Sequence, residues 1–481
     1  MQELLKKCIF FFILSVVLSS CMSDDTTPSN QIYTASSSQV SIKAESNVSV
    51  RTPDIIINSG TEISYFSSWN ISKNNTEIVT LWTVYDADNM DKSAILINDL
   101  KGKRVFLMDK QEHVLHEWTL WIWGLWNDFE ILPDGKILAL LKTKLNSIET
   151  GGTGGNIQLL GGAGGHIQLI DTNWKVSWDF TIANNNTILH HDVELLPNGN
   201  ILAMEWNRVA GKTVGYKLDT DIFLERLIEI NPKTNAIVWE WRSRDHILQD
   251  TNPKIANYGN IEKSPERIDI NYSQSASGMV MHANWFVYDP VKDLIYLSVY
   301  NFSEVWVIDH STTRQEARGS AGGTYERWGD LVYRFGNPSA YRWSGTRLFY
   351  STHHPSFTHS GTFLIYSNGK GATPEQSTVY ELQLPEEIGK KQSVMKMPEV
   401  VWSYTHPDLY FDKVGWAVRL PNGNTLITEW DGGIWEVTRE KKLVWKYTQK
   451  PAMFWRTYSY SLDSPAIKAL ELDISGSREK K

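Results

Sequence analysis

A short turn motif recurs along this chain and constrains its fold more than any other feature. Residues 195–202 read Leu-Leu-Pro-Asn-Gly-Asn-Ile-Leu, and close copies occupy 131–138 and 420–426. Proline fixes φ for a turn, and Asn-Gly or Asp-Gly supplies the positive φ of a tight hairpin between aliphatic strands. Looser copies at 288–297 and 358–365 bring the number of these inner hairpins to five.

A second unit, which we call the outer hairpin, follows each inner one and ends in an aromatic residue. Two hairpins make a four-stranded sheet, and sheets that repeat at roughly 60–70 residues are typical of propeller blades. We therefore predict an all-β fold, a six-bladed β-propeller over residues 85–460. An array of β-sandwiches is the alternative, but the paired turns favour a closed ring. The six outer hairpins end at Trp118, Trp178, Trp241, Phe335, Tyr404 and Tyr447.

The N-terminus resembles a targeting segment. Two lysines precede an apolar run at 9–18, which is too short for a confident membrane span, and the run ends in Leu-Ser-Ser-Cys at 18–21. This pattern predicts a lipoprotein-type signal peptide over 1–21 with lipidation at Cys21, an ordinary signal peptide being the alternative. We expect a lipid-anchored protein of the bacterial cell envelope, facing the periplasm or the outer membrane.

The remaining segments outside the ring are less distinctive. Residues 22–45 are rich in Ser, Thr, Asn and Gln and predict a flexible tether. Residues 46–84 predict a short N-terminal β extension, either a small extra sheet or the strand that closes the ring. Residues 461–481 predict a polar tail that is either frayed or a short docking segment. The glycine-rich runs 151–155 and 161–165 lack the Lys-Ser/Thr of a phosphate loop, which favours a flexible loop between blades.

Charge and histidine placement narrow the function. The net charge is −8 with no basic block, so nucleic acid is not an expected partner.

Histidines occur at the starts of four blades, and the first strand of each blade lines the central channel of a propeller. Equivalent positions should therefore meet at the axis, although each histidine alone could be a structural hydrogen-bonding residue. These positions are His190-His191, His282, His353-His354 and His406.

The histidine motifs, together with residues 302–310 and 333–338, resemble the bacterial arylsulfotransferase (aryl-sulfate sulfotransferase) family over roughly 85–450. The resemblance implies a six-bladed propeller that moves a sulfuryl group from an aryl sulfate to a phenol through a sulfohistidine. It implies no cofactor and no nucleotide sulfate donor. It also implies His354 as the nucleophile and His191 and His282 as holders of the sulfuryl oxygens. The adjacent alternates are His353 and His190.

The residue chemistry suits these roles. Imidazole is a neutral nucleophile that tolerates an anion, and it titrates in a range useful for accepting a phenol proton. The family carries an arginine after its His-x-Asn motif, and Tyr300 stands at that place. Arg208, Arg334 or Arg342 are candidates for the missing charge. The candidate substrate-binding residues are Asn284, Tyr300, Trp206 and Trp285, and Phe357 is a further ring that could stack on an aryl group or belong to the core.

Three other functions compete with sulfuryl transfer. A propeller without turnover could bind an aryl or sulfated ligand, which the Tyr300 replacement favours. Three convergent histidines could hold a divalent cation for a lyase or hydrolase. A quinoprotein dehydrogenase is weaker, since the blades lack the repeated tryptophan docking pattern of that class. The transferase hypothesis involves no metal.

Overall fold

The computed structural model describes most of the chain from residue 84 onward. Residues 1–47, which include the predicted signal peptide, Cys21 and the whole predicted tether, lie outside the described residues. The described residues are 84–119, 125–143, 157, 160–389, 396–431, 433–450 and 452–472, with short strands at 48–51, 55–59, 61–65, 68–71 and 79–80.

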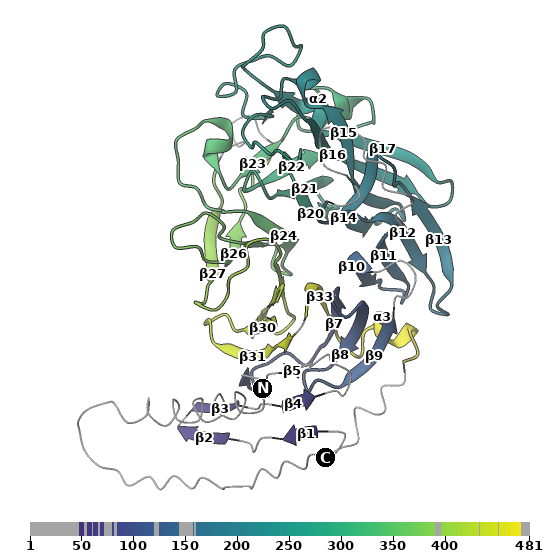
Figure 1. Ribbon diagram of the computed structural model, residues 1–481, viewed down its shortest axis with the longest axis vertical. Helices are drawn as coiled ribbons and strands as arrows, with labels where there is room; N and C mark the ends of the chain where they lie inside the picture. The colour runs from purple at the N-terminus through teal and green to yellow at the C-terminus, as the bar shows by residue number, and fades with distance from the viewer. Residues whose placement is uncertain are drawn as a thin grey trace, which may run out of the picture. The chain divides into compact units, whose positions relative to one another are not determined.

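Six antiparallel sheets, five of four strands and one of seven, surround one axis and confirm the predicted six-bladed propeller (Figure 1). Neighbouring innermost strands contact one another all the way round, so the ring is closed. The innermost strands are β33 (Phe454–Tyr460), β10 (Leu125–Ile131), β14 (Thr187–Leu195), β20 (Ala283–Asp289), β24 (Thr352–Phe357) and β28 (Trp416–Arg419).

The other three strands of each blade follow outward from the axis. The second strands are β7 (Ala94–Asp99), β11 (Ile137–Lys142), β15 (Ile201–Ala210), β21 (Leu294–Val299), β25 (Phe363–Ser367) and β29 (Thr425–Glu429). The third strands are β8 (Arg104–Met108), β12 (Gly165–Ile170), β16 (Asp221–Asn231), β22 (Glu304–Asp309), β26 (Thr378–Gln383) and β30 (Gly433–Val437). The outermost strands are β9 (Val114–Thr119), β13 (Val176–Thr181), β17 (Ala236–Arg242), β23 (Tyr333–Phe335), β27 (Glu399–Tyr404) and β31 (Leu443–Tyr447).

The ring is closed by β33 from the C-terminal part of the chain, which pairs antiparallel with β7 and so completes the first blade. The N-terminal strands take a different place. Strands β2 (Ile55–Ser59), β3 (Thr61–Tyr65) and β6 (Val84–Tyr85) extend the outer edge of the last sheet through β31. Strand β1 (Val48–Arg51) pairs with β4 (Ser68–Ile71), and β5 (Val79–Thr80) pairs with β32 (Gln449–Lys450).

Tryptophans in four of the outermost strands tie one blade to the next. The indole N–H of Trp178 donates to Asn235, that of Trp239 to Thr312, that of Trp402 to the Arg439 carbonyl and that of Trp445 to the Lys110 carbonyl. Each donor lies in one blade and its acceptor in the following one. These hydrogen bonds give four of the repeated tryptophans a role in joining the blades.

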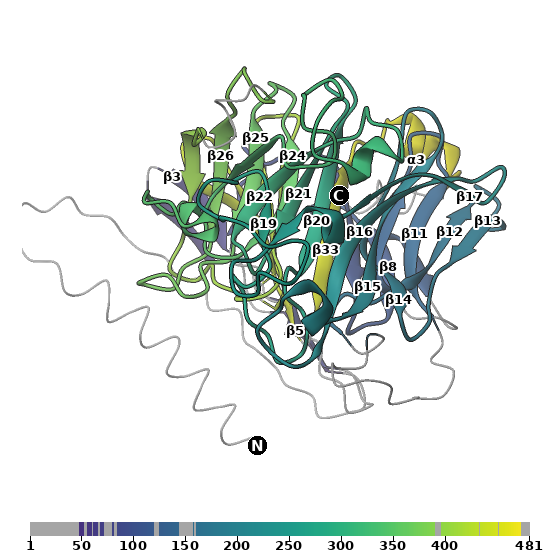
Figure 2. The ribbon, with the colours of Figure 1, turned by 90° about the horizontal axis from the view of Figure 1, so that it is seen from above.

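The second strands are buried on both faces because neighbouring blades cover them. All six residues of β21 are buried, and the apolar clusters lie between adjacent sheets. Past the ring, α3 (Pro465–Ala469) packs Ala466 and Ile467 into the cluster shared by the first two blades (Figure 2). The described part of the predicted polar tail is thus docked. No helix among the described residues is long and apolar enough to cross a membrane.

Candidate active site

β-Bulges mark the wall of the axis at the level of the histidines. Five of the six innermost strands carry one, namely β10, β14, β20, β24 and β33. In β14 the pairing jumps from His190 to Val193, and in β24 it jumps from His353 to Ser356. A bulge interrupts the ladder and re-aims the side chains of the extra residues. The histidine motifs of β14 and β24 lie in these interruptions.

Three histidines share an uncommon backbone conformation. The φ angles of His191, His282 and His354 are 53°, 53° and 48°. A positive φ at a residue other than glycine costs on the order of 1–3 kcal/mol and is concentrated at functional sites. The same conformation at the corresponding position of three blades indicates that the surrounding structure imposes it for a purpose.

We call five histidines around a line of aromatic rings the histidine cluster; four of them are buried and His282 is partly buried. The ring centroids of His191 and His282 are 4.9 Å apart, and Tyr300 lies 5.5 Å from His282 and 5.4 Å from His353. Residues from three blades therefore meet, as the sequence predicted from their equivalent positions. The cluster comprises His190, His191, His282, His353 and His354.

His354 is held in one tautomer. Its Nδ1 lies 2.7 Å from the carbonyl oxygen of Ala417, which can only accept a hydrogen bond. The amide nitrogen of Ala417 is farther from the same atom, at 3.4 Å, so the carbonyl decides the tautomer. The Nδ1 atom therefore carries the proton, and the lone pair is on Nε2. Burial, followed by the charge of Arg456, lowers the pKa of His354 well below its usual value.

Aromatic rings fix the plane of this imidazole. It stacks on Trp416 with a centroid distance of 3.5 Å and meets the edge of Trp285 at 4.8 Å. The ring cannot turn without displacing one of these indoles, so the Nε2 lone pair has a defined direction.

Burial favours the neutral form of His191, His282 and His353 as well. Burial lowers the pKa of His282 to about 3 and that of His353 to about 4, and it lowers the pKa of His191 strongly. The Nδ1 atom of His353 donates to Asn368 Oδ1 at 2.7 Å, because the amide nitrogen of Asn368 is committed to two backbone carbonyls. The Nδ1 atom of His282 is buried and has no hydrogen-bond partner among the described residues.

His190 is turned toward a carboxylate and supports its neighbour. Its Nε2 lies 2.9 Å from Glu225, its ring stacks on Trp206 at 4.0 Å, and its Nδ1 lies 2.9 Å from Nδ1 of His191. Glu225 also accepts hydrogen bonds from the Trp206 indole and from the amide of Ala283. This arrangement places His191, rather than His190, beside His282.

A buried arginine that the sequence analysis missed joins the two halves of the cluster. Arg456 on β33 lies 2.7 Å from Asp128 and 3.0 Å from Asp192, and it donates to the backbone carbonyl of His191 at 2.6 Å. Its guanidinium group covers the face of Trp285 at 3.3 Å. The arginine thus contacts the backbone of one site histidine and the indole that touches another.

A glycine forms part of the wall. The φ of Gly162 is +90°, and a Cβ at this position would lie 2.0 Å from the ring of His191. The carbonyl of Gly162 accepts from Asn127 and from the amide of His191. The expectation that the run 161–165 is a flexible loop is therefore wrong, because these residues pack against the histidine and the strand β14.

The family follows from comparison with known proteins. The model of the family described as arylsulfotransferase (ASST) matches residues 23–428. The chain belongs to the arylsulfotransferase family. This confirms the resemblance drawn from the histidine motifs. No curated protein matches the chain.

Solved structures similar to this arylsulfotransferase-family chain are distant. A protein of unknown function from Bacteroides caccae is 14% identical, with a TM-score of 0.43, over 77% of this chain and 99% of that one. The β-propeller domain of Myceliophteria thermophila Cps50 (Swd1) is 9% identical, with a TM-score of 0.37, over 78% and 94%. A periplasmic gluconolactonase from Pseudomonas aeruginosa is 10% identical, with a TM-score of 0.38, over 74% and 82%.

Tyr300, which the sequence resemblance places at the family's arginine position, donates its hydroxyl hydrogen to the backbone carbonyl of Asp412. The three arginines suggested as substitutes are engaged elsewhere. Arg208 is ion-paired with Asp221, and Arg334 is buried against Glu304 on the outer part of its blade. The third, Arg342, pairs with two carboxylates, Asp250 and Asp269.

The predicted substrate-binding residues fall into two groups. Trp206 stacks on His190 within the protein, and Phe357 packs against Tyr296 and Phe363, so both have core contacts. Trp285 borders His354 directly. The amide nitrogen of Asn284 donates to the Thr352 carbonyl of the next blade, while its buried oxygen has no partner among the described residues. His406 does not join the cluster and lies beside Trp435.

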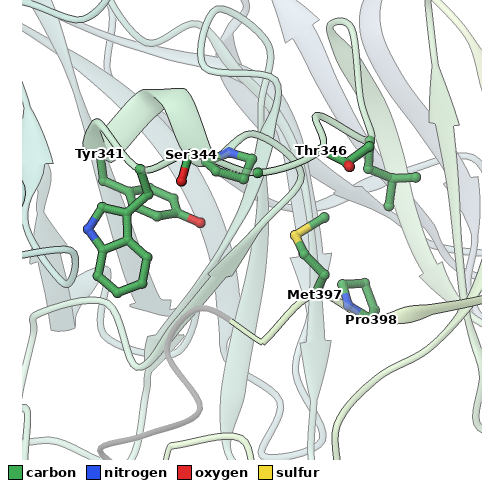
Figure 3. Close-up of a pocket in the computed structure, with 9 residues that line it drawn as sticks. Tyr341, Ser344, Thr346, Met397 and Pro398 are labelled. Carbon is green, nitrogen blue, oxygen red and sulfur yellow. The ribbon is translucent and has the colours of Figure 1, made fainter.

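A separate pocket lies away from the histidines. It has a volume of about 390 Å³ and is lined by residues of the loops that follow β23 and precede β27, including Tyr341, Thr346 and Met397 (Figure 3). None of its lining residues belongs to the histidine cluster, so this pocket does not define the family's reaction site. Among the described residues, no group of three or more His, Cys, Asp or Glu side chains is arranged to hold a metal ion.

Proposed function

We propose that the protein transfers a sulfuryl group from an aryl sulfate to a phenol through a covalent sulfohistidine at His354. The observation that carries this proposal is the hydrogen bond from Nδ1 of His354 to the Ala417 carbonyl, which leaves the Nε2 lone pair available in a neutral ring. A nucleophile that must approach an anionic sulfuryl group is best neutral, and a buried imidazole with a lowered pKa remains so below pH 7.

The reaction proceeds in two steps. In the first, the Nε2 lone pair forms a bond to sulfur, the bond between sulfur and the aryl oxygen breaks, and the electron pair leaves with the phenolate, which takes up a proton. In the second, the oxygen of the acceptor phenol bonds to sulfur, the N–S bond breaks and its electron pair returns to Nε2. The acceptor gives up its proton to a base. Nothing is oxidised or reduced.

The neighbouring histidines supply the polar contacts that these steps need. Neutral imidazoles can donate a hydrogen bond from one nitrogen and accept a proton at the other. His191 and His282 lie side by side, and the buried Nδ1 of His282 has no partner within the described part of the chain. Such a nitrogen can bind a sulfuryl oxygen or take the acceptor's proton. Trp285 beside His354 offers a surface for the aryl ring.

The test is to trap the intermediate. Incubation of the protein with nitrophenyl sulfate and no acceptor is expected to release one equivalent of coloured phenol and to add one SO₃ group, located by peptide mass spectrometry on His354. Because the pKa of His354 is lowered, we expect the rate of this first step to show no half-loss near about pH 6.5, where an unperturbed histidine would lose half its free base.

Two outcomes would contradict the proposal. An SO₃ group on another residue would move the nucleophile, and His353 would then be the first alternative. If the folded protein released no phenol with any acceptor, the alternative would be favoured, namely a propeller that binds an aryl or sulfated ligand without turnover.

We also propose that the protein is a lipid-anchored component of the bacterial cell envelope, attached through Cys21. The support is the apolar run followed by Leu-Ser-Ser-Cys in the sequence. Growth with a labelled fatty acid is expected to label the wild-type protein and leave Cys21→Ser unlabelled. Equal labelling of both would refute attachment at this cysteine. The control, Cys8→Ser, is expected to remain labelled.

A further inference from the structure

The histidine cluster needs a cation if its substrate is an aryl sulfate, which carries a negative charge. Two cations act on the pKa values of these histidines: Arg456 acts on His191, His353 and His354, and Lys370 acts on His282. Arg456 is already matched by two buried carboxylates, as described above. It therefore brings no surplus positive charge to the site.

Within the part of the chain that the structure describes, Lys370 has no buried carboxylate partner, and it lies one aromatic ring away from the histidines. Its Nζ is 5.8 Å from the centroid of the Tyr300 ring, and that ring contacts both His282 and His353. The lysine is thus placed beside the same tyrosine that occupies the family's arginine position. The side chain is about half exposed, at 47%, so it reaches the cluster from solvent.

The loop after β25 fixes the backbone just before Lys370 and leaves its side chain partly exposed. Asn368 is buried and binds His353 through Oδ1, and it also binds the Phe411 and Val414 carbonyls. Gly369 has a φ of +79°, and a Cβ there would lie 2.0 Å from the Gln376 carbonyl oxygen. The same asparagine that orients a site histidine therefore fixes the start of the lysine's loop.

The present partner of Lys370 is weak. Its Nζ lies 3.6 Å from Asp412 Oδ2, and both side chains are partly exposed, a setting in which an ion pair contributes little. Sulfuryl oxygens can displace such a carboxylate because a charge-assisted hydrogen bond inside the site is stronger than a solvated one. The backbone of Asp412 is in turn bound by the Tyr300 hydroxyl.

We propose that Lys370 is the substrate-binding cation of this protein. Its ammonium group gives up its contact with Asp412 and binds the anionic sulfuryl group above Tyr300 and His282. This inference rests on the proposed function for the identity of the anion. The charge would come from a loop of the blade that follows the one carrying Tyr300.

The test compares Lys370→Gln with Lys370→Arg, and uses Lys233→Gln, in an exposed turn of another blade, as the charge-matched control. We expect KM for nitrophenyl sulfate to rise at least about tenfold in Lys370→Gln. We expect a smaller change in kcat, because the sulfuryl charge is already present in the ground state. Lys370→Arg keeps the charge and should raise KM less than Lys370→Gln does, whereas the control should stay near wild type. Asp412→Asn should lower KM by about twofold because the competing carboxylate is gone.

A binding measurement separates this inference from the reaction. Equilibrium dialysis with nitrophenyl sulfate and with nitrophenol is expected to show that Lys370→Gln weakens binding of the sulfate alone. That result would support the lysine's role even in a protein without turnover. Sulfuryl transfer through His354 with an unchanged KM in Lys370→Gln would overturn the inference while leaving the proposed function intact. Equal affinity of the wild type for the sulfate and the phenol would also overturn it.

Discussion

Replacing His354 by asparagine is expected to lower the rate of phenol release from an aryl sulfate by roughly 10³-fold or more. Without the nucleophile the sulfohistidine cannot form, and the remaining groups of the site have no intermediate to stabilise. Asparagine suits the position since it tolerates the left-handed φ of 48° better than other residues and its amide can still donate to the Ala417 carbonyl. The variant should therefore fold, and its loss of activity should come from the missing nucleophile. Stopped-flow measurement of the coloured phenol gives the rate.

The matched control is His406→Asn, which changes a histidine outside the cluster and is expected to retain wild-type rates. His353→Asn tests the adjacent alternate. It should lower the rate less than His354→Asn does, since it leaves Nε2 of His354 in place. A burst of phenol that survives in His354→Asn would exclude this residue as the nucleophile.

Replacing Arg456 by methionine is expected to lower the free energy of unfolding by about 3–5 kcal/mol, because it leaves Asp128 and Asp192 as buried carboxylates without their cation. Burial already raises the pKa of both carboxyls, and Arg456 opposes that rise. Without the arginine their folded pKa values rise further above the values in the unfolded chain. The destabilisation should therefore be full at high pH and should shrink as the pH falls through the folded pKa values. Denaturant unfolding at several pH values measures it.

A triple variant separates charge from packing. Arg456→Met combined with Asp128→Asn and Asp192→Asn removes the unpaired charges and should recover much of the lost stability, with little pH dependence. If the single and triple variants are equally unstable at all pH values, the arginine contributes through its contact with Trp285 and not through its ion pairs.

The ring itself could be predicted from the sequence because its signals are local. Pro-Asn-Gly turns between aliphatic runs specify hairpins, and the tryptophans at the ends of the outer hairpins have a physical role, since several donate to the following blade. The convergence of the histidines also followed, because equivalent positions of a closed ring must meet at its axis. These inferences need only the period of the chain and the symmetry of the fold.

Long-range pairing could not be predicted in this way. Arg456 lies in a strand without a turn motif, and the strand's partner, β7, is near the other end of the propeller sequence. The contact of Gly162 with His191 depends on a loop whose composition indicates only flexibility. The position of Lys370 beside Tyr300 joins two blades. In each case the deciding contact is between residues far apart in the chain, and nothing in the local composition marks it.

The closing of the ring by β33 bears on how the protein is made. Translation delivers the first five innermost strands and all the site histidines before residues 454–460 leave the ribosome. Until then β7 has an unpaired edge, and the two buried aspartates have no arginine. Any product that stops early therefore lacks the closing strand and the central charge together. The last strand of the ring to be synthesised, β33, both closes the propeller and brings Arg456 to its two aspartates. Partial chains without it therefore cannot assemble the histidine cluster in its final form.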